Sequence, residues 1–269
     1  MCRFNNPPSR RTTRRAVTLV EMLLAMAVLA MMTVALGALT QAVRVSSDLT
    51  HGTSTATQHA RVTLHRIETA TATACANEAF PGSFVVADTI GTYDYPDTLI
   101  VWRPGSDPQN PDGLPRFDEI VVFCTNPNAP NELLEITAPG DSRTVPEISN
   151  VAAWNSELAT LKTGPASQKA LLTDLVRTAA PSGNLATSRG AVRFAVSLCP
   201  SDQDWADYRA GNIAFADVPW AQTVYGRESG LRQTRVATEL QLVARQGNTS
   251  LATTIPFFGS AALYWELRP

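Results

Sequence analysis

Glu21 is a carboxylate at the edge of a long apolar segment. It directly precedes a run of 22 residues, Met22 to Val43, that contains no charged residue and no proline. A carboxylate at the centre of a bilayer costs on the order of 2.5 to 3.5 kcal/mol, and less at the edge, so Glu21 is expected to need a cationic partner. If the chain were cut before Val17, the new α-amine would lie about 6 Å along a helix axis from Glu21. The spacing therefore predicts an ion pair between this amine and Glu21, within one chain or between neighbouring chains.

The usual signatures of catalysis and of cofactor binding do not occur in the sequence. The segment 226–230 (GRESG) resembles a nucleophile elbow, but its serine stands one position too late. There is no phosphate-binding loop, no dinucleotide fingerprint and no H-E-x-x-H motif. His51, His59 and His65 are separated by eight and six residues, a spacing that does not bring three imidazoles to one face of a helix. We therefore expect neither an enzyme nor a metal site, and no cofactor.

Two segments rich in oxygen ligands have a plainer interpretation. The loop 107–113 (DPQNPDG) offers oxygens that suit Ca²⁺, but it contains two prolines and lacks the closing Glu of an EF-hand. We interpret it as a surface loop, although the sequence does not decide whether it binds Ca²⁺. The acidic and aromatic segment from Ser201 to Trp220 has no His, Lys or nucleophile spaced for acid–base chemistry. It is expected to be a loop or short helix with a solvated or partner-binding surface.

The run from Met22 to Val43 is long enough to cross a membrane. As a helix it would reach roughly 33 Å, the thickness of a bilayer core. It is longer than the apolar region of a secretory signal and has no A-x-A site behind it, so we expect it to be retained as an anchor. The five arginines before it are Arg3, Arg10, Arg11, Arg14 and Arg15. The positive-inside rule then keeps the N-terminus in the cytoplasm and places the rest of the chain outside it.

The segment 14–21 (RRAVTLVE), followed by the apolar run, resembles the N-terminal signal of the type IV pilin and pseudopilin family. That signal consists of basic residues, a small residue, a hydrophobic residue and then Thr-Leu-x-Glu. The matching residues here are Ala16 as the small residue, Val17 as the first mature residue, and Thr18, Leu19 and Glu21.

The resemblance implies a sequence of maturation steps. A membrane prepilin peptidase would cleave after Ala16, the amine of Val17 would be methylated, and the mature chain would assemble into a helical filament. Within the family, the residue equivalent to Glu21 is thought to pair with the N-terminal amine of an adjacent subunit. The family usually has Gly and Phe at the positions of Ala16 and Val17, so this chain departs from the pattern at both.

Beyond the apolar run, the segment 44–75 has no proline and a single glycine. Its apolar residues recur at steps of three and four, at Ala56, Ala60, Leu64, Ile67, Ala70 and Ala74. This period predicts an amphipathic helix. We expect one long helix from Val17 to Ala74, with residues 17–43 in lipid and residues 44–75 packed on a globular head. Residues 1–16 are expected to be a disordered cytoplasmic leader.

The remaining residues, 76–269, are expected to form a β-rich head. Short β-type runs occur at Ser83–Ala87, Thr98–Arg103, Glu119–Cys124, Leu133–Thr137 and Ala191–Cys199. The runs 99–102 (LIVW) and 120–123 (IVVF) are continuously apolar, which predicts central strands covered on both faces. Strict alternation from Arg235 to Arg245 predicts a half-exposed strand, and 253–258 with 261–267 would follow it after a turn at Gly247-Asn248.

A helical insertion is predicted within 146–183. In it, Ser167 would cap a helix that stops before Pro181. The predicted fold class is thus α+β: a long N-terminal helix, transmembrane in its first half, packed on an antiparallel β-rich head. This is the arrangement that the pilin resemblance also implies.

Charge and cysteine content restrict the partners and the compartment. Removal of residues 1–16 leaves 17 of the 22 basic side chains against 24 acidic ones, a formal charge of −7, so we expect no nucleic-acid binding. Three cysteines remain in the mature chain: Cys75, Cys124 and Cys199. Outside the cytoplasm one disulfide can form, and the sequence leaves all three pairings open.

The sequence therefore predicts a minor pseudopilin or pilin subunit of the bacterial inner membrane, which enters a periplasmic or surface filament. Its expected partners are other subunits, the prepilin peptidase and the membrane. The segment 56–67 (ATQHARVTLHRI) resembles the J-type minor pseudopilins of type II secretion, and retention of Glu21 speaks against the minor class that lacks this residue. The alternatives are a pilus-borne adhesion or DNA-uptake subunit and a single-pass membrane-anchored enzyme. Sequence does not decide between a secretion and a pilus system.

Overall fold

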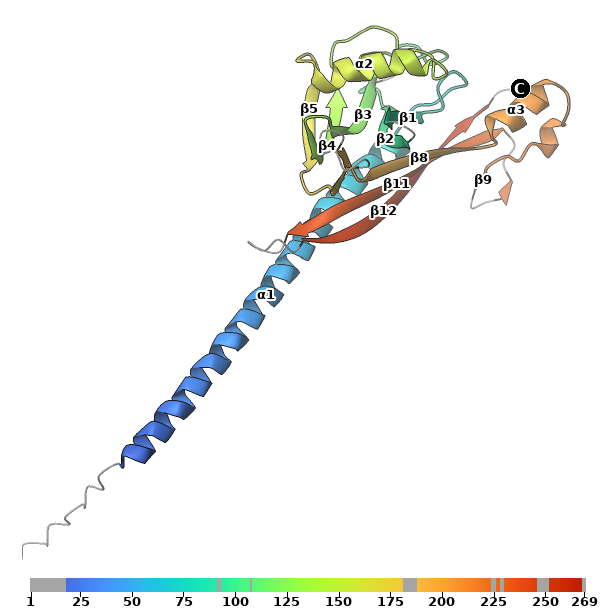
Figure 1. Ribbon diagram of the computed structural model, residues 1–269. Helices are drawn as coiled ribbons and strands as arrows, with labels where there is room; N and C mark the ends of the chain where they lie inside the picture. The colour runs from blue at the N-terminus through green and yellow to red at the C-terminus, as the bar shows by residue number, and fades with distance from the viewer. Residues whose placement is uncertain are drawn as a thin grey trace, which may run out of the picture. The chain divides into compact units, whose positions relative to one another are not determined.

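The computed structural model describes residues 18–90, 93–106, 108–180, 188–223, 226–227, 230–245 and 252–267. The chain has an α+β fold with a long N-terminal helix, α1 (Leu19–Ala72), and antiparallel sheets (Figure 1). The chain divides into two compact units, Met1–Asp48 and Leu49–Pro269, so α1 begins in one unit and ends in the other. The prediction of one long helix is confirmed from Leu19 to Ala72, and Val17 lies outside the described residues.

The first sheet contains five antiparallel strands in sequence order. They are β1 (Ser83–Ile90), β2 (Tyr93–Trp102), β3 (Ile120–Asn126), β4 (Ala129–Thr137) and β5 (Gln168–Thr173). The first four lie where the sequence predicted strands. A short 3-10 helix, Phe117–Glu119, leads into β3.

The helical insertion predicted within 146–183 is only partly right. Helix α2 (Val151–Thr163) occupies its first part and is capped by Asn150, whose side chain accepts from the backbone N–H of Ala153 at 3.1 Å. The helix predicted to start at Ser167 is wrong, because this segment forms β5 and pairs with β4. The hydroxyl of Ser167 donates instead to carbonyls at the end of α2, those of Leu161 at 2.7 Å and Gly164 at 3.1 Å.

The second sheet has three strands in the order β12-β11-β8. They are β8 (Val192–Cys199), β11 (Leu231–Arg245) and β12 (Ala252–Glu266). Smaller elements are β6 (Thr178–Ala179), β7 (Arg189–Gly190), α3 (Asp202–Arg209), a 3-10 turn at Phe215–Asp217, β9 (Gln222–Thr223) and β10 (Gly226–Arg227). The two runs predicted after residue 252 form one strand, and the predicted turn at Gly247-Asn248 lies outside the described residues.

The alternation predicted for β11 is confirmed by burial. Its inward residues are Thr234, Val236, Thr238, Leu240, Leu242 and Ala244, all of them buried. Arg235 and Ala237, which lie between them, are exposed. One face of the second sheet therefore belongs to the core and the other faces solvent.

The first sheet is covered on both faces. One face carries Leu99, Val121 and Phe123, which share a core cluster with α1 and with the inner face of the second sheet. On the other face, side chains of α2, including Trp154 and Leu158, pack against the first sheet. Double coverage explains why β2 and β3 are continuously apolar.

The second half of α1 lies close to both sheets because its buried face is built from small residues. Ala56, Ala60 and Ala70 have almost no exposed surface. On the second sheet, a Cβ at Gly259 would lie only 3.0 Å from the Cδ2 of Leu64, so a glycine there allows the close approach. The close packing over this stretch follows from side-chain size.

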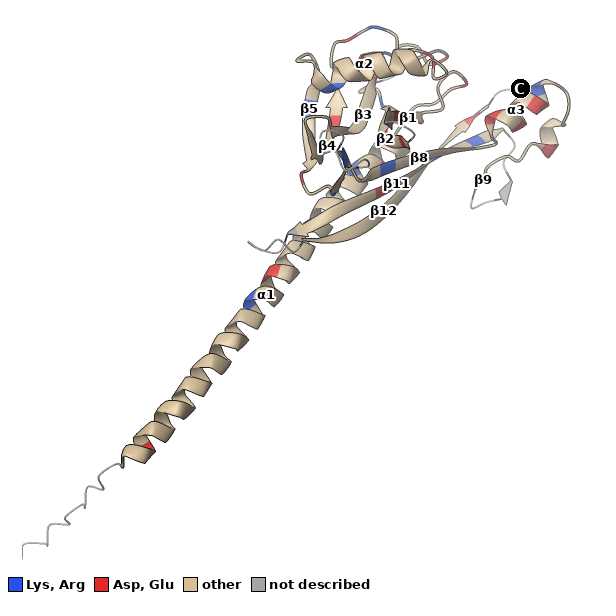
Figure 2. Cartoon of the chain, in the orientation of Figure 1, with Lys and Arg blue, Asp and Glu red and all other residues tan. Residues whose placement is uncertain are grey.

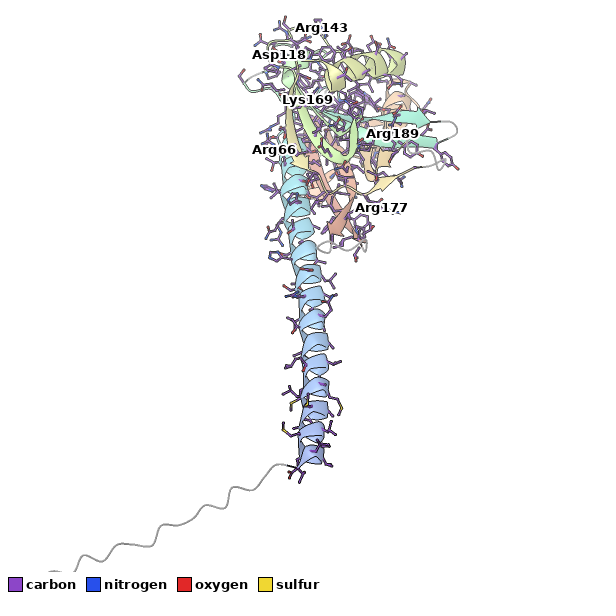
Figure 3. The ribbon with its side chains drawn as sticks, turned by 60° about the vertical axis from the view of Figure 1, so that its left-hand side comes forward. Arg66, Asp118, Arg143, Lys169, Arg177 and Arg189 are labelled. Carbon is purple, nitrogen blue, oxygen red and sulfur yellow. The ribbon has the colours of Figure 1, made fainter. Side chains whose placement is uncertain are left out.

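One ion pair also joins α1 to the first sheet. The Nε and Nη2 atoms of Arg66 donate to the two carboxylate oxygens of Glu135 on β4, each at 2.7 Å. Arg66, which is labelled in Figure 3, belongs to the part of α1 that packs on the sheets. Hydrogen bonding to Glu135 raises the pKa of Arg66, so the guanidinium stays charged. Two parallel hydrogen bonds restrict the rotation of α1 over β4.

Candidate functional site

The start of α1 is a capping box made by Thr18 and Glu21. The backbone N–H and the hydroxyl of Thr18 donate to the Oε2 atom of Glu21, at 2.8 and 3.0 Å. In return, the backbone N–H of Glu21 donates to the Thr18 hydroxyl at 3.3 Å. Such reciprocal bonds satisfy backbone N–H groups that the first turn of a helix leaves unpaired, and a carboxylate there also suits the helix dipole. The Thr-x-x-Glu spacing of Thr18 and Glu21 is the sequence signal for this capping box, in addition to the charge of Glu21.

The capping box leaves part of the Glu21 carboxylate available. Both hydrogen bonds from Thr18 end on Oε2, and Oε1 accepts none from the residues that the structure describes. An ionised carboxylate accepts about four hydrogen bonds, so a second donor can approach without breaking the cap. Ala16 and Val17, the predicted cleavage pair, lie outside the described residues, as does the predicted methylation site at Val17.

The first half of α1 is apolar and unburied on every side. All residues from 18 to 51 are exposed, and the large apolar side chains from Leu19 to Val43 are between 44% and 78% exposed. Figure 2 shows α1 without charge from just past a red band near its start as far as a blue and a red band near its middle. Monomeric soluble proteins rarely expose contiguous apolar surface beyond about 600 Å². This surface therefore requires a cover of lipid or protein.

Helix α1 also meets the other requirements of a membrane span. It is the helix among the described residues that is long and apolar enough to cross a membrane, and none of its most apolar stretch is buried. Its two hydroxyls within the run are satisfied internally, because Thr33 donates to the carbonyl of Leu29 and Thr40 to that of Leu36. Hydroxyls bonded in this way do not need water, so they are tolerated in lipid.

The three histidines do not gather at one place. His59 lies against β5, with its Nδ1 atom 3.1 Å from the hydroxyl of Thr173, whereas His51 and His65 are exposed. No group of three or more His, Cys, Asp or Glu side chains is placed to hold a metal in the described part of the chain.

Side chains from neighbouring segments form hydrogen bonds with the backbone of the loop 107–113, for which the sequence left Ca²⁺ binding open. The carboxylate of Glu119 accepts from the N–H of Gln109 at 2.7 Å and from that of Arg116 at 2.9 Å. The side-chain amide of Asn77 donates to the carbonyls of Pro111 and Gly113. Asp107 lies outside the described residues. The backbone of this loop is therefore held in place by side chains from outside it.

The acidic and aromatic segment 201–220 forms α3 and shares a small hydrophobic core with Trp265 and Leu267. Its aromatic residues Trp205, Tyr208, Phe215 and Trp220 contact one another. Ser201 and Asp204 form a capping box, and these hydrogen bonds lower the pKa of Asp204. Asp202 forms an ion pair at 2.6 Å with Arg232, whose side chain is 4% exposed. The expectation of a loop or short helix is confirmed, and its aromatic residues pack inward.

None of the three disulfides left open by the sequence is formed among the described residues. Cys124 is buried in the first sheet, where desolvation raises the pKa of its thiol to about 11. Cys199 is exposed at the end of β8, and its thiol donates to the carbonyl of Pro219 at 3.3 Å. The two side chains are thus in very different environments.

Comparison with protein-family models, with curated protein sequences and with solved structures finds no match to this chain. Its function must therefore be inferred from its own residues. The feature that most needs a functional explanation is the exposed apolar half of α1, with Thr18 and Glu21 at its start.

Proposed function

We propose that the chain is a minor pseudopilin or pilin subunit, cut after Ala16, whose α1 joins a filament core built of similar helices. The observation that carries this proposal is the first half of α1, which exposes large apolar side chains in all directions behind a single carboxylate. Lipid would cover this helix before assembly, and equivalent helices of neighbouring subunits would cover it afterwards. The role is structural, and no catalytic step belongs to it.

The proposed topology follows from charge. Five arginines in residues 1–16 hold the leader in the cytoplasm of a bacterial cell, and α1 crosses the inner membrane. The unit from Leu49 onward then faces the periplasm. The antiparallel sheets that pack on the second half of α1 support the proposal of a β-rich head.

Glu21 gives the assembly its charge pair. Cleavage after Ala16 creates an amine at Val17, and N-methylation leaves it cationic. The Oε1 atom of Glu21, which is not used by the Thr18 cap, accepts this amine from an adjacent subunit. In a core without water, an unpaired carboxylate is strongly unfavourable, so the pair selects a fixed register between neighbouring helices.

The choice between secretion and pilus systems has weaker support. The pattern at 56–67 that resembles J-type subunits includes Ala56, Ala60 and Ile67, all of which are buried against the sheets. Packing within the head alone accounts for these three residues. The proposal of a pilin or pseudopilin subunit therefore rests on α1. Genetic tests can distinguish a secretion pseudopilus from a pilus.

Substitution of Glu21 separates its two roles. Glu21→Gln keeps a side chain that can cap Thr18 but removes the charge, whereas Glu21→Ala removes both. We expect both variants to insert into membranes like the wild type but to be lost from sheared filaments. Asp48→Ala, which removes an acid of the same helix beyond the apolar run, is the control and should assemble normally. Wild-type filament content for Glu21→Gln would exclude the charge pair.

Processing is tested separately in cells that contain the prepilin peptidase. Ala16→Trp puts a bulky side chain at the proposed cleavage site and should leave the full-length precursor in the membrane. Thr12→Trp makes the same change four residues earlier and should be processed normally. A mature-size band from Ala16→Trp would rule out cleavage at this position.

A further inference from the structure

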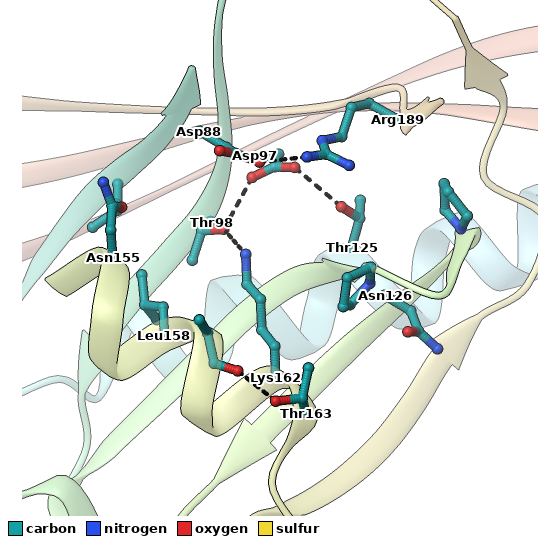
Figure 4. A pocket seen from close by; sticks show the side chains of 14 residues that line it. Asp88, Asp97, Thr98, Thr125, Asn126, Asn155, Leu158, Lys162, Thr163 and Arg189 are labelled. Carbon is teal, nitrogen blue, oxygen red and sulfur yellow. Dashed lines mark hydrogen bonds and ion pairs between the residues drawn. The ribbon is translucent and has the colours of Figure 1, made fainter. Parts of the chain in front are cut away.

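A cavity of about 290 Å³ lies in the head, between α2 and the first sheet (Figure 4). Its walls come from β1, β2, the end of β3, α2 and β7, all within the unit Leu49–Pro269. The volume is at the lower end of the range found for small-molecule sites, about 300 to 1,000 Å³. A small ligand such as a single metabolite would fit this cavity.

One side of the cavity carries a buried carboxylate. Asp97 on β2 is 3% exposed, and its two oxygens accept hydrogen bonds from the hydroxyls of Thr98 at 2.9 Å and Thr125 at 3.1 Å. The ammonium of Lys162 on α2 donates to the Thr98 hydroxyl at 2.9 Å. A carboxylate accepts about four hydrogen bonds and a lysine donates three, so both groups have capacity left for a ligand.

The cavity also carries a second cation. Arg189 on β7 donates from Nη2 to Asp88 at 2.6 Å, and Figure 4 shows it across the cavity from Lys162. Its Nε atom is buried and meets no acceptor among the described residues. The Arg189 side chain as a whole is 25% exposed, and its guanidinium has further N–H groups besides the one that binds Asp88, so it can also donate to a ligand oxygen.

These charges select among ligand classes. The cations Lys162 and Arg189 disfavour a metal ion, and the carboxylates Asp88 and Asp97 disfavour a phosphate or other simple anion. A ligand that carries both a cation and an anion can pair its cation with a carboxylate of the cavity and its anion with Lys162 or Arg189. The lining also includes apolar residues, among them Val86, Leu158 and Ala159, which can accommodate a hydrocarbon side chain.

We propose that this cavity binds a free α-amino acid as its zwitterion. The ammonium group lies on Asp97, the carboxylate accepts from Lys162 and from the guanidinium of Arg189, and an aliphatic side chain packs against Leu158. This site is separate from the membrane helix and independent of the proposed role in a filament. It would make the head a sensor or carrier of a small metabolite.

The ligand test uses the full chain in detergent micelles and isothermal titration calorimetry. Leucine should bind saturably at one site per chain. N-acetylleucine lacks the ammonium and leucinamide lacks the carboxylate, so each should bind about tenfold to a hundredfold more weakly. Equal binding of either analogue would overturn the proposal, as would binding of inorganic phosphate without leucine, or no binding by leucine or any other free aliphatic amino acid.

Variants assign the binding to this cavity. Lys162→Met and Arg189→Gln should each weaken leucine binding at least about tenfold, because each removes a charged donor to the carboxylate. Lys169→Met is the matched control, since Lys169 donates to the carbonyl of Gly164 and does not line the cavity. Thermal unfolding of each variant verifies that it is folded. Unchanged affinity in folded Lys162→Met and Arg189→Gln proteins would place the ligand elsewhere.

Discussion

Replacement of Arg66 by methionine is expected to lower the free energy of unfolding of the head by about 2 kcal/mol. The change leaves the Glu135 carboxylate without its two hydrogen bonds, although the Glu135 side chain is only 8% exposed. Breaking a fully buried pair costs about 3 to 5 kcal/mol, and breaking an exposed pair about 0.2 to 1 kcal/mol. Because Arg66 is 46% exposed and water partly screens the pair, we expect an intermediate value.

The assay is urea unfolding of the full chain in detergent, followed by tryptophan fluorescence. Trp102 and Trp154 are both buried in the head, so their emission should shift when it unfolds. The change in free energy is obtained from the transition midpoint and slope.

Two further variants show whether the orphaned carboxylate is the cause. The double variant Arg66→Met with Glu135→Leu should be more stable than Arg66→Met alone, because it removes the unpaired buried charge. Arg143→Met breaks the exposed pairs with Asp141 and Glu157 and is the control, since Arg143 is 57% exposed. It should cost less than about 1 kcal/mol. Equal losses for Arg66→Met and Arg143→Met, or no recovery in the double variant, would refute the reasoning.

Two other predictions concern the head. Iodoacetamide at pH 8 should label Cys199 in the native protein and Cys124 only after unfolding, because Cys124 is buried and its thiol pKa is raised to about 11. Peptide mapping by mass spectrometry identifies the labelled cysteines. Equal labelling of Cys124 and Cys199 in the native protein would contradict the packing of β3. Ser201→Ala should destabilise the protein by about 1 kcal/mol at neutral pH through loss of the α3 cap. Because the folded-state pKa of Asp204 is lowered, this contribution is present above the ordinary carboxyl pKa and is lost as pH falls through the folded value, so unfolding curves of wild type and variant should converge in acid.

Much of the fold was predictable because its signals are local. The exposed first half of α1 is visible as an uncharged run, and the buried face of its second half as apolar residues at helical spacing. The two continuous apolar runs in β2 and β3 and the alternation in β11 likewise report how many faces of each strand are covered. These patterns depend only on the periods of helix and strand.

The segment after Ser167 shows where local signals fail. Its Lys-Ala-Leu-Leu sequence has good helix propensity, yet it forms β5, with Leu171 opposite Leu134 of β4. The free edge of β4 offers backbone hydrogen bonds that an isolated short helix cannot match, so pairing across the sheet prevails over propensity. The cavity escaped prediction for a related reason, because Asp97, Lys162 and Arg189 are far apart in the sequence and come from three different elements.

The sequence by itself determined the long apolar helix, the carboxylate at its start and the β-rich character of the remainder, because each is encoded by neighbouring residues. Only the tertiary structure decided that β5 is a strand, that Arg66 pairs with Glu135, and that two cations and two carboxylates line one cavity. Those features arise when distant segments meet. The contacts that stabilise them join residues far apart in the sequence, so no single segment of the chain can form them alone.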